Sequence, residues 1–384
     1  MRLRTSFAAE QVCECGRPWH SFPLSGIYIR MAIFLKSICA NAKVCAALVG
    51  TVIGAGFVSG AELVRFFPSQ GFVPWAALCA ALFGVLFYAL LRLGKKYGGY
   101  AGVLRFAFGR FAPAVRVLVL GCSLVLCGSM LAGVDAAVRE GFGLCYRFPF
   151  FALPSLVVLY FLSGRGINGV YAVNLVLVPL ILAFVFGFAP GADYAGFAYS
   201  PPSGVFYRGG MVLLYTAMNA FLAAPVACDM GAKSGGGGAG CVAAAILIGF
   251  CAATVLGRIA REGAGAYTAE MPFLHAVGSG AVGKLFALVC LCGIFTTLFS
   301  SYYPLHSFVQ EKKHSAFLRA GICAAAFLLS LLGLRGIVAW LYPALGFAGL
   351  FFFAACALAA RRGRTGRKRL FLFAVRRKKR GTSA

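Results

Sequence analysis

An acidic residue, Glu62, lies inside a long apolar segment and follows a run of closely spaced glycines. Gly50, Gly54, Gly56 and Gly60 are separated by four, two and four positions, a spacing that also fits close packing of membrane helices through small residues. A carboxylate in lipid costs ~2.5–3.5 kcal/mol on insertion scales unless it faces a cavity or a partner. We therefore interpret the segment as a membrane helix that is interrupted at a binding site.

If the backbone unwinds between Gly54 and Gly60, one half-helix ends in carbonyl groups suited to a cation, and another begins near Ala61. The free N–H groups of the second half-helix would attract an anion. Glu62, in its first turn, could bind a coupling cation, a proton or a substrate ammonium group. A zwitterionic solute matches both half-helix ends.

A second apolar segment, from Tyr215 through Asn219 to Pro225, also carries residues unfavourable to a regular helix. Unwound backbone is tolerated at membrane depth only where protein buries it or where it lines a cavity, and paired interruptions mark the binding sites of transporters. Asn219 would hydrogen-bond either the substrate or a neighbouring helix. The predicted substrate-binding residues are Gly54, Ala55, Gly56, Phe57, Ser59, Gly60, Glu62, Tyr215 and Asn219.

The composition is that of a polytopic membrane protein. Of 384 residues, 61% are hydrophobic and 12% charged, and the mean hydropathy is +0.87, which leaves too little polar surface for a soluble globule. Apolar windows predict an all-α integral membrane fold of about ten transmembrane helices. Residues 32–360 are expected to form one transporter domain, with 44–188 and 207–360 as inverted repeats of five helices, broken in helices 1 and 6.

The charged residues are distributed unevenly. The chain has 36 Lys and Arg against 10 Asp and Glu, a formal net charge of +26. The basic residues gather in alternate connecting segments and in the tail 361–384, which is the pattern of the positive-inside rule rather than of nucleic-acid binding. We therefore expect a cell-membrane protein with both termini in the cytoplasm and with anionic lipid headgroups at the tail. Asp135 and Asp229, near span ends, are expected as gate or boundary charges.

No catalytic or metal centre is predicted. The chain has 4 His and 10 acidic residues without a recognisable nucleophile–base pair, and the run Cys13-Glu14-Cys15 with His20 lacks the second ligand pair of a zinc site. We expect a protein that is not an enzyme and needs no cofactor besides a coupling ion. Residues 1–31 are expected to be a disordered extension or to precede a translation start at Met31.

The residues around Glu62 resemble the glycine-rich first-helix signature of the YkvI-like membrane protein family. They read Val52-Ile53-Gly54-Ala55-Gly56-Phe57-Val58-Ser59-Gly60-Ala61-Glu62-Leu63. Further landmarks of that family follow in the same order over about 32–360, namely Met130-Leu131-Ala132-Gly133, Val178-Pro179-Leu180, Tyr215 with Asn219, Glu270-Met271-Pro272 and Phe295-Thr296-Thr297.

The resemblance implies a branch of the amino acid–polyamine–cation superfamily with the LeuT-type five-plus-five inverted-repeat fold. It also implies a permease of an amino acid or related solute. The residues from Gly54 to Phe57 are similar to the carboxylate-binding glycine motif of such permeases. The chain departs from the family pattern at Ala61, where a Gln is common, so any polar contact from that position is missing.

A coupling-ion site follows from the same resemblance. Similar transporters place hydroxyl groups of the eighth helix and carbonyls of the first around sodium, and the corresponding residues are Val52, Glu62, Thr296, Thr297, Ser300 and Ser301. Helical spacing puts Thr297 on one face with either Ser300 or Ser301. The alternative is that these hydroxyls hydrogen-bond to carbonyls of their own helix.

The leading hypothesis is a cation-coupled secondary transporter of an amino acid or similar small zwitterion, working by alternating access around the unwound part of helix 1. Sodium and protons are both compatible with the sequence as coupling ions. The alternative is a membrane sensor or channel with the same fold that does not transport through a gated cycle.

Overall fold

The computed structural model describes residues 24–146, 148–162, 179–199, 204–233, 237–278, 280–310 and 312–380. The chain divides into two compact units, residues 1–39 and 40–384, and helix α1 begins in the first and ends in the second. The helices are α1 (Leu24–Val52), α2 (Ala55–Val58), α3 (Ala61–Phe66), α4 (Val73–Tyr97), α5 (Tyr100–Phe108), η1 (Gly109–Phe111), α6 (Ala112–Phe142), α7 (Ala152–Leu162), η3 (Ala189–Gly191), α9 (Val205–Lys233), α10 (Gly238–Glu262), α11 (Ala264–Thr268), α12 (Pro272–Val277), α13 (Ala281–Val309), α14 (Ser315–Ser330) and α15 (Gly333–Arg380). Within the described residues, the fold is all-helical apart from one isolated β-bridge, Gln70 to Gly196.

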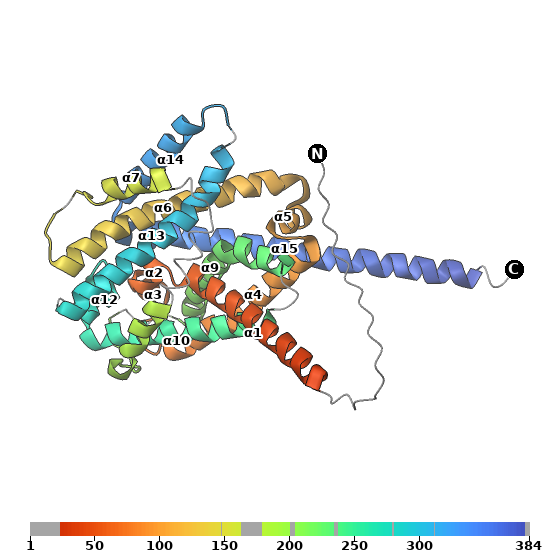
Figure 1. Ribbon diagram of the computed structural model, residues 1–384, viewed down its shortest axis with the longest axis horizontal. Coiled ribbons are helices and arrows are strands. Elements are labelled where there is room, and N and C mark those ends of the chain that lie inside the picture. Colours follow the sequence, from red (N-terminus) through yellow and green to blue (C-terminus); the bar gives the residue numbers. More distant parts are fainter. Residues whose placement is uncertain are drawn as a thin grey trace, which may run out of the picture. The chain divides into compact units, whose positions relative to one another are not determined.

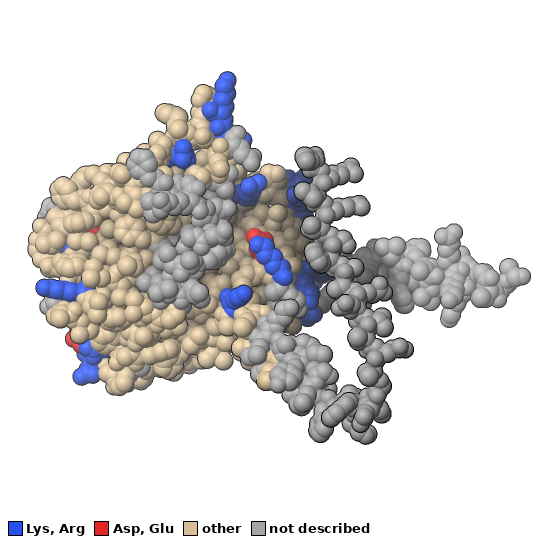
Figure 2. Space-filling view, in the orientation of Figure 1, with Lys and Arg blue, Asp and Glu red and all other residues tan. Residues whose placement is uncertain are grey.

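The described part of the chain is a multi-pass membrane protein. Six helices are long and apolar enough to cross a membrane: Val73–Tyr97, Tyr100–Phe142, Val205–Lys233, Gly238–Glu262, Ala281–His306 and Gly333–Arg362. Two shorter apolar helices, Ser37–Val52 and Ser315–Ser330, accompany them. The predicted fifth span, 166–192, lies outside the described residues as far as residue 178 and is described from 179 onward. Figure 2 shows a visible face that is mostly free of charged side chains, as contact with lipid requires.

The predicted interruption of the first helix is confirmed. Helix α1 ends at Val52, and two short helices, α2 and α3, continue the segment. Gly60 precedes α3 with a φ of 81°, a left-handed conformation that glycine adopts without a steric penalty. The amide of Val58 donates to the carbonyl of Gly54 at 3.0 Å. The break therefore has a defined backbone geometry.

The predicted interruption of the sixth helix is wrong. Helix α9 runs unbroken from Val205 to Lys233 with Pro225 inside it. Residues 211–230 contain no glycine, in contrast to the first segment. Their backbone therefore lacks the residue type that adopts non-helical conformations without a steric penalty. The Thr216 hydroxyl and the Asn219 amide donate to carbonyls four residues earlier, at 2.8 and 3.1 Å. A single proline is tolerated in a membrane helix because neighbouring groups satisfy the freed backbone.

The helices of the second unit pack in two groups (Figure 1). Helix α4 packs against α9 and α10, while α6 packs against α7, α13 and α14. The broken segment contacts both groups, because α2 contacts α6 and α13, whereas α3 contacts α9, α10 and α15. Helix α15 also joins the groups, since it packs against both α9 and α6. Glycines bring α4 and α9 into backbone contact, since a Cβ at Gly94 would overlap the backbone of Cys228 and one at Gly231 that of Leu91.

Two aspartates expected as gate or boundary charges hold the starts of helices. The side chain of Asp135, in α6, is buried and accepts hydrogen bonds from the amides of Phe151 and Ala152 at 3.0 Å each, where α7 begins. The Asp229 carboxylate accepts the amide of Tyr100, the first residue of α5, at 2.8 Å. An aspartate from another helix thus satisfies donors that a helix N-terminus leaves unpaired.

The end of α6 fixes the start of α12. The Glu140 carboxylate accepts hydrogen bonds from the amides of Glu270, at 2.7 Å, and Met271, at 3.1 Å. The neighbouring Arg139 forms an ion pair with the Glu270 side chain. Helix α12 in turn reaches the broken segment, because the amide of Phe273 donates to the carbonyl of Ser59 at 2.8 Å.

Replacing Gly60 with Ala should lower the free energy of unfolding more than replacing Gly71 with Ala. Both glycines have positive φ, 81° and 62°, so both changes carry a left-handed backbone strain of ~1–2 kcal/mol. Only at Gly60 would the new Cβ also lie 2.7 Å from Ile259 Cδ1 and 3.1 Å from the Phe273 nitrogen, whereas Gly71 faces open space. Unfolding of both variants in detergent measures the difference, and equal losses would contradict the close packing at the break.

Candidate functional site

The Glu62 carboxylate is buried at the break without a full set of partners. Glu62 is 6% exposed, and its Oε2 atom has no hydrogen-bond partner. Its other oxygen, Oε1, lies against the α-carbon of Gly56, so closely that a methyl group there would overlap it. Within the described residues, no arginine or lysine forms an ion pair with Glu62. An unpaired buried acceptor costs ~1–3 kcal/mol, more if it is charged, which makes Glu62 a candidate functional residue.

Helix α9 supplies two predicted binding residues to the same place. The side chain of Asn219 lies close to the Glu62 carboxylate, and its Nδ2 donates to the Tyr215 carbonyl at 3.1 Å. Tyr215 is fully buried, and its hydroxyl has no hydrogen-bond partner. The structure therefore brings Glu62, Asn219 and Tyr215 together, although α9 is continuous.

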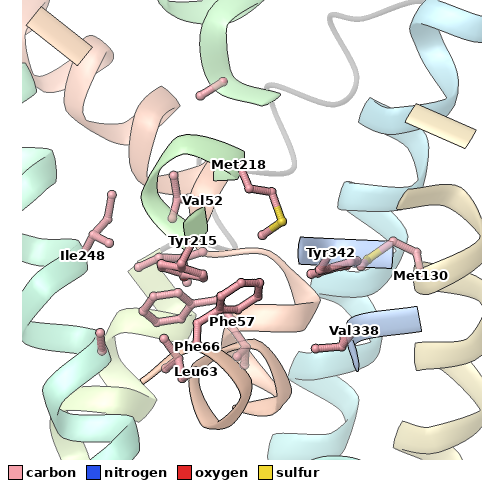
Figure 3. Packing of buried hydrophobic residues seen from close by; sticks show 14 of the residues in the cluster. Val52, Phe57, Leu63, Phe66, Met130, Tyr215, Met218, Ile248, Val338 and Tyr342 are labelled. Atoms are coloured by element: carbon pink, nitrogen blue, oxygen red, sulfur yellow. The ribbon is translucent and has the colours of Figure 1, made fainter. Parts of the chain in front are cut away.

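Aromatic rings enclose this group. The ring of Tyr215 lies 5.6 Å from that of Phe66 and 5.4 Å from that of Phe67, measured between centroids. Figure 3 shows Phe57 and Phe66 close to Tyr215, with Tyr342 and Met130 on the neighbouring elements. Phe57, which the sequence predicts to bind substrate, is completely buried in the apolar core.

Thr297, in α13, is a predicted coupling-ion residue that lies against the break. A Cβ built on Gly54 would lie 2.9 Å from Thr297 Oγ1, so the two residues are in contact across α13 and the break. The same hydroxyl donates to the Gly293 carbonyl at 3.0 Å, as the alternative interpretation of these hydroxyls expects. Ser301 is buried. The side chains of Ala55, Thr296 and Ser300 lie outside the described part of the structure.

Several backbone groups predicted to bind ligands already have partners. The Val52 carbonyl accepts the amide of Gly54 at 2.8 Å. The Ser59 hydroxyl donates to the Gly56 carbonyl at 2.9 Å and accepts the Ala61 amide at 3.3 Å. Helix α3 has only six residues, so its dipole is short. The polar side chains at the break are thus better ligand candidates than the half-helix ends.

Tyr342, which the sequence does not predict, lies near Glu62 and is paired with Ser129. The hydroxyl groups of Ser129, in α6, and Tyr342, in α15, are 2.8 Å apart. Tyr342 and Tyr215 are close enough to Glu62 to interact with it electrostatically. Neither Ser129 nor Tyr342 belongs to a sequence motif, and only the packing of α6 and α15 around the break reveals them.

No group of three His, Cys, Asp or Glu side chains that could hold a metal ion occurs in the described residues. The run Cys13-Glu14-Cys15 and His20, for which no metal site is predicted, lie outside the described residues.

The fold is similar to that of solved membrane transporters. The chain is similar to the inward-facing conformation of Mhp1, with a TM-score of 0.56 and 15% identity, over 82% of this chain and 74% of the other. Mhp1 in a closed conformation is described as a nucleobase-cation-symport-1 family transporter. It gives a TM-score of 0.55 at 15% identity, and the match covers 79% of this chain and 74% of the Mhp1 chain. A manganese transporter of Eremococcus coleocola gives a TM-score of 0.52 at 15% identity, and the match covers 85% of this chain and 78% of the transporter chain.

A sequence relative has a name that matches the resemblance found at the first helix. The chain is 26% identical over 333 residues to the uncharacterized membrane protein YkvI of Bacillus subtilis (strain 168), which covers 82% of this chain and 95% of that one. No family model matches the chain. The comparisons thus support a multi-pass membrane protein with a transporter fold.

Replacing Gly56 with Ala should destabilise the protein, but much less when Glu62 is also replaced with Ala. A methyl group at position 56 would overlap Oε1, Cδ and Cγ of Glu62, and the truncation removes all three atoms. Residues in contact show coupling energies of about 0.5–3 kcal/mol, and we expect a value in the upper half of that range from unfolding of the four proteins of the cycle. Gly84 is the control, since its Cβ would meet only Ala245, at 3.6 Å.

Additive effects of the two changes would contradict the placement of Glu62 against Gly56. A loss in Gly84→Ala as large as that in Gly56→Ala would show that the cost is a general effect of adding a methyl group to a helix interface.

Proposed function

We propose that the protein is a cation-coupled secondary transporter of an amino acid or related small zwitterionic solute. The observation that carries the proposal is the Glu62 carboxylate, buried at the break of the first helix with its Oε2 atom unpartnered. A buried carboxylate is retained at such a cost where it exchanges a cation, a proton or an ammonium group during function. The transporter fold and the resemblance to the YkvI-like family support the same conclusion.

The position of the break supports an alternating-access mechanism. Its α2 part contacts α6 and α13, and its α3 part contacts α9, α10 and α15, so relative movement of the two helix groups would change the surroundings of Glu62. Binding of a cation at Glu62 and of the solute beside Tyr215 and Asn219 would favour one arrangement of the groups. A ligand shifts such an equilibrium only through its different affinity for the two states.

Thr297 supports a sodium-coupled form of the proposal. Sodium is a hard cation that prefers oxygen ligands, and the Thr297 hydroxyl lies against Gly54 in the break. A proton-coupled form needs Glu62 alone. Variants of the two residues separate these forms.

The proposed location is the cell membrane with both termini in the cytoplasm. Lys95 and Lys96 lie in the last turn of α4, and Tyr100, which follows them, packs its ring near that of Phe352 in the second half of the membrane part of α15. Arg361 and Arg362 therefore lie toward the same end of the helices as these lysines. The excess of basic residues at that end supports a cytoplasmic orientation and an association of the basic tail with anionic lipid.

The first experiment measures the thermal unfolding midpoint of the purified protein in detergent. Amino acids, amines and organic acids are each added in sodium and in potassium buffers at two pH values. A ligand at ~100 times its dissociation constant stabilises the folded state by about 2.7 kcal/mol. Each stabilising compound is then tested for uptake into proteoliposomes. Binding without uptake under any ion gradient would favour the membrane sensor and contradict the proposal.

Replacing Glu62 with Gln should reduce cation-driven uptake about ten- to a hundredfold, because the loss of a charge-assisted interaction of ~1.5–3 kcal/mol has that effect. Glutamine keeps the size of the side chain and its contact with Gly56. The matched control is Glu262→Gln, since Glu262 is partly exposed and forms only a 3.2 Å ion pair with Arg258 on the same helix. Normal rate, affinity and cation dependence in Glu62→Gln would show that Glu62 has no role in transport.

Replacing Thr297 with Val should raise the sodium concentration required for half-maximal uptake by about tenfold, since valine keeps the shape but lacks the oxygen ligand. Thr297→Ser should retain sodium dependence. Thr254→Val is the control, because the buried hydroxyl of Thr254 has no hydrogen-bond partner. An unchanged sodium dependence in Thr297→Val would contradict a sodium site at Thr297. Wild-type uptake that does not depend on sodium would leave proton coupling through Glu62.

A further inference from the structure

A cavity of about 410 Å³ lies beside α3, between α9, α11 and α15. Phe66 and Phe67 line it and also pack against the ring of Tyr215, which is not among its described lining residues. The aromatic pair therefore separates the cavity from the buried group around Glu62. Figure 3 shows Phe66 between Leu63 and Tyr215 in this layer.

The lining of the cavity is strongly basic. Three arginines contribute to it from three different helices: Arg65 from α3, Arg208 from α9 and Arg335 from α15. Glu270 is the single acidic residue of the described lining, and its charge is offset by the ion pair with Arg139. The cavity thus attracts anions.

Two of the arginines are held in place while keeping donors for a ligand. Arg65 donates one hydrogen bond, from Nη2 to the Ala339 carbonyl at 3.1 Å, and Arg335 donates one from Nη1 to the Thr268 carbonyl at 3.0 Å. A guanidinium group has five N–H donors, so each retains several. Its planar fork matches the two oxygens of a carboxylate.

Another side of the cavity is lined by aromatic side chains of tyrosines, here called the tyrosine wall. The rings of Tyr199 and Tyr267 are stacked, with centroids 4.9 Å apart and planes at 15°, and both residues line the cavity. The Tyr267 hydroxyl donates to the Ser69 carbonyl at 3.3 Å, which fixes the ring. Tyr207 lines the cavity from the start of α9. Rigid aromatic walls favour a planar, apolar ligand body.

We propose that this cavity is a capture site for organic carboxylates with a planar apolar body, and that the transported solute belongs to this class. The second part rests on the proposed transport function. The carboxylate binds Arg65 and Arg335, and the body of the solute packs on the tyrosine wall. Passage beyond Phe66 and Phe67 then brings the solute to Tyr215, Asn219 and Glu62.

Phenylacetate and phenethylamine are suitable probes, because they share a ring and differ in the sign of their charge. Calorimetric titration of the full-length protein in detergent should detect phenylacetate binding and at least about tenfold weaker binding of phenethylamine. The double change Arg65→Gln and Arg335→Gln should weaken phenylacetate binding by about tenfold or more. Arg261→Gln is the control, because Arg261 also donates one bond to a carbonyl, of Gly191 at 3.1 Å, but does not line the cavity.

The double change Arg65→Lys and Arg335→Lys tests the same site if the glutamine variant does not fold. Lysine keeps the charge but lacks the planar fork, so phenylacetate binding should weaken while the difference from phenethylamine remains. Equal binding of the two probes, no binding of phenylacetate, or wild-type phenylacetate binding in either double variant would overturn the inference and assign the arginines a purely structural role.

Glu62→Gln separates this inference from the transport proposal. That variant should still bind phenylacetate, since Glu62 does not line the cavity. Normal uptake by Glu62→Gln would overturn the role of Glu62 alone. Cation-driven uptake of a solute without a carboxylate, by a protein that does not bind phenylacetate, would overturn the capture site alone.

Discussion

Backbone polar groups inside a membrane must find partners within the protein, and this requirement governs the structure around the break in the first helix. The hydroxyl of Ser59 bridges the Gly56 carbonyl and the Ala61 amide. The backbone carbonyl of Ser59 accepts the amide of Phe273. Because Gly60 adopts a left-handed conformation, the chain can turn here at little steric cost. The interruption is therefore satisfied by contacts from one side chain and one distant helix.

The same break places a buried carboxylate, that of Glu62, inside the apolar core. Its two short helices contact different helix groups, and the Glu62 side chain lies between them, against Gly56 and beside Asn219. A glycine is needed at position 56 for a steric reason as much as for backbone freedom, because the carboxylate occupies the space of a side chain. Because Glu62 is buried, its electrostatic interactions are stronger than they would be in water.

The sequence predicts the membrane class from composition and the interruption of the first helix from glycine spacing. It predicts the meeting of Glu62, Tyr215 and Asn219 only through the family resemblance and an expected second interruption that α9 does not have. It does not predict that α9 is continuous, since the fate of Pro225 depends on neighbours that satisfy the backbone. Nor does it predict the buried role of Asp135, whose partners are the amides that begin α7. Contacts between helices far apart in sequence leave no local signal, and the Ser129–Tyr342 pair is a further case.

The hydrogen bond between the Ser59 carbonyl and the Phe273 amide has a kinetic consequence. Both residues are completely buried, so no water replaces the bond when it breaks. A rearrangement that separates α3 from α12 has to cross a barrier that includes this loss. A rearrangement that keeps the bond would move α3 and α12 together as a rigid body, with the end of α6 attached through Glu140. In the proposed alternating-access cycle, the rate of exchange would thus depend on Ser59, Phe273 and Glu140 as well as on the residues proposed to bind the solute.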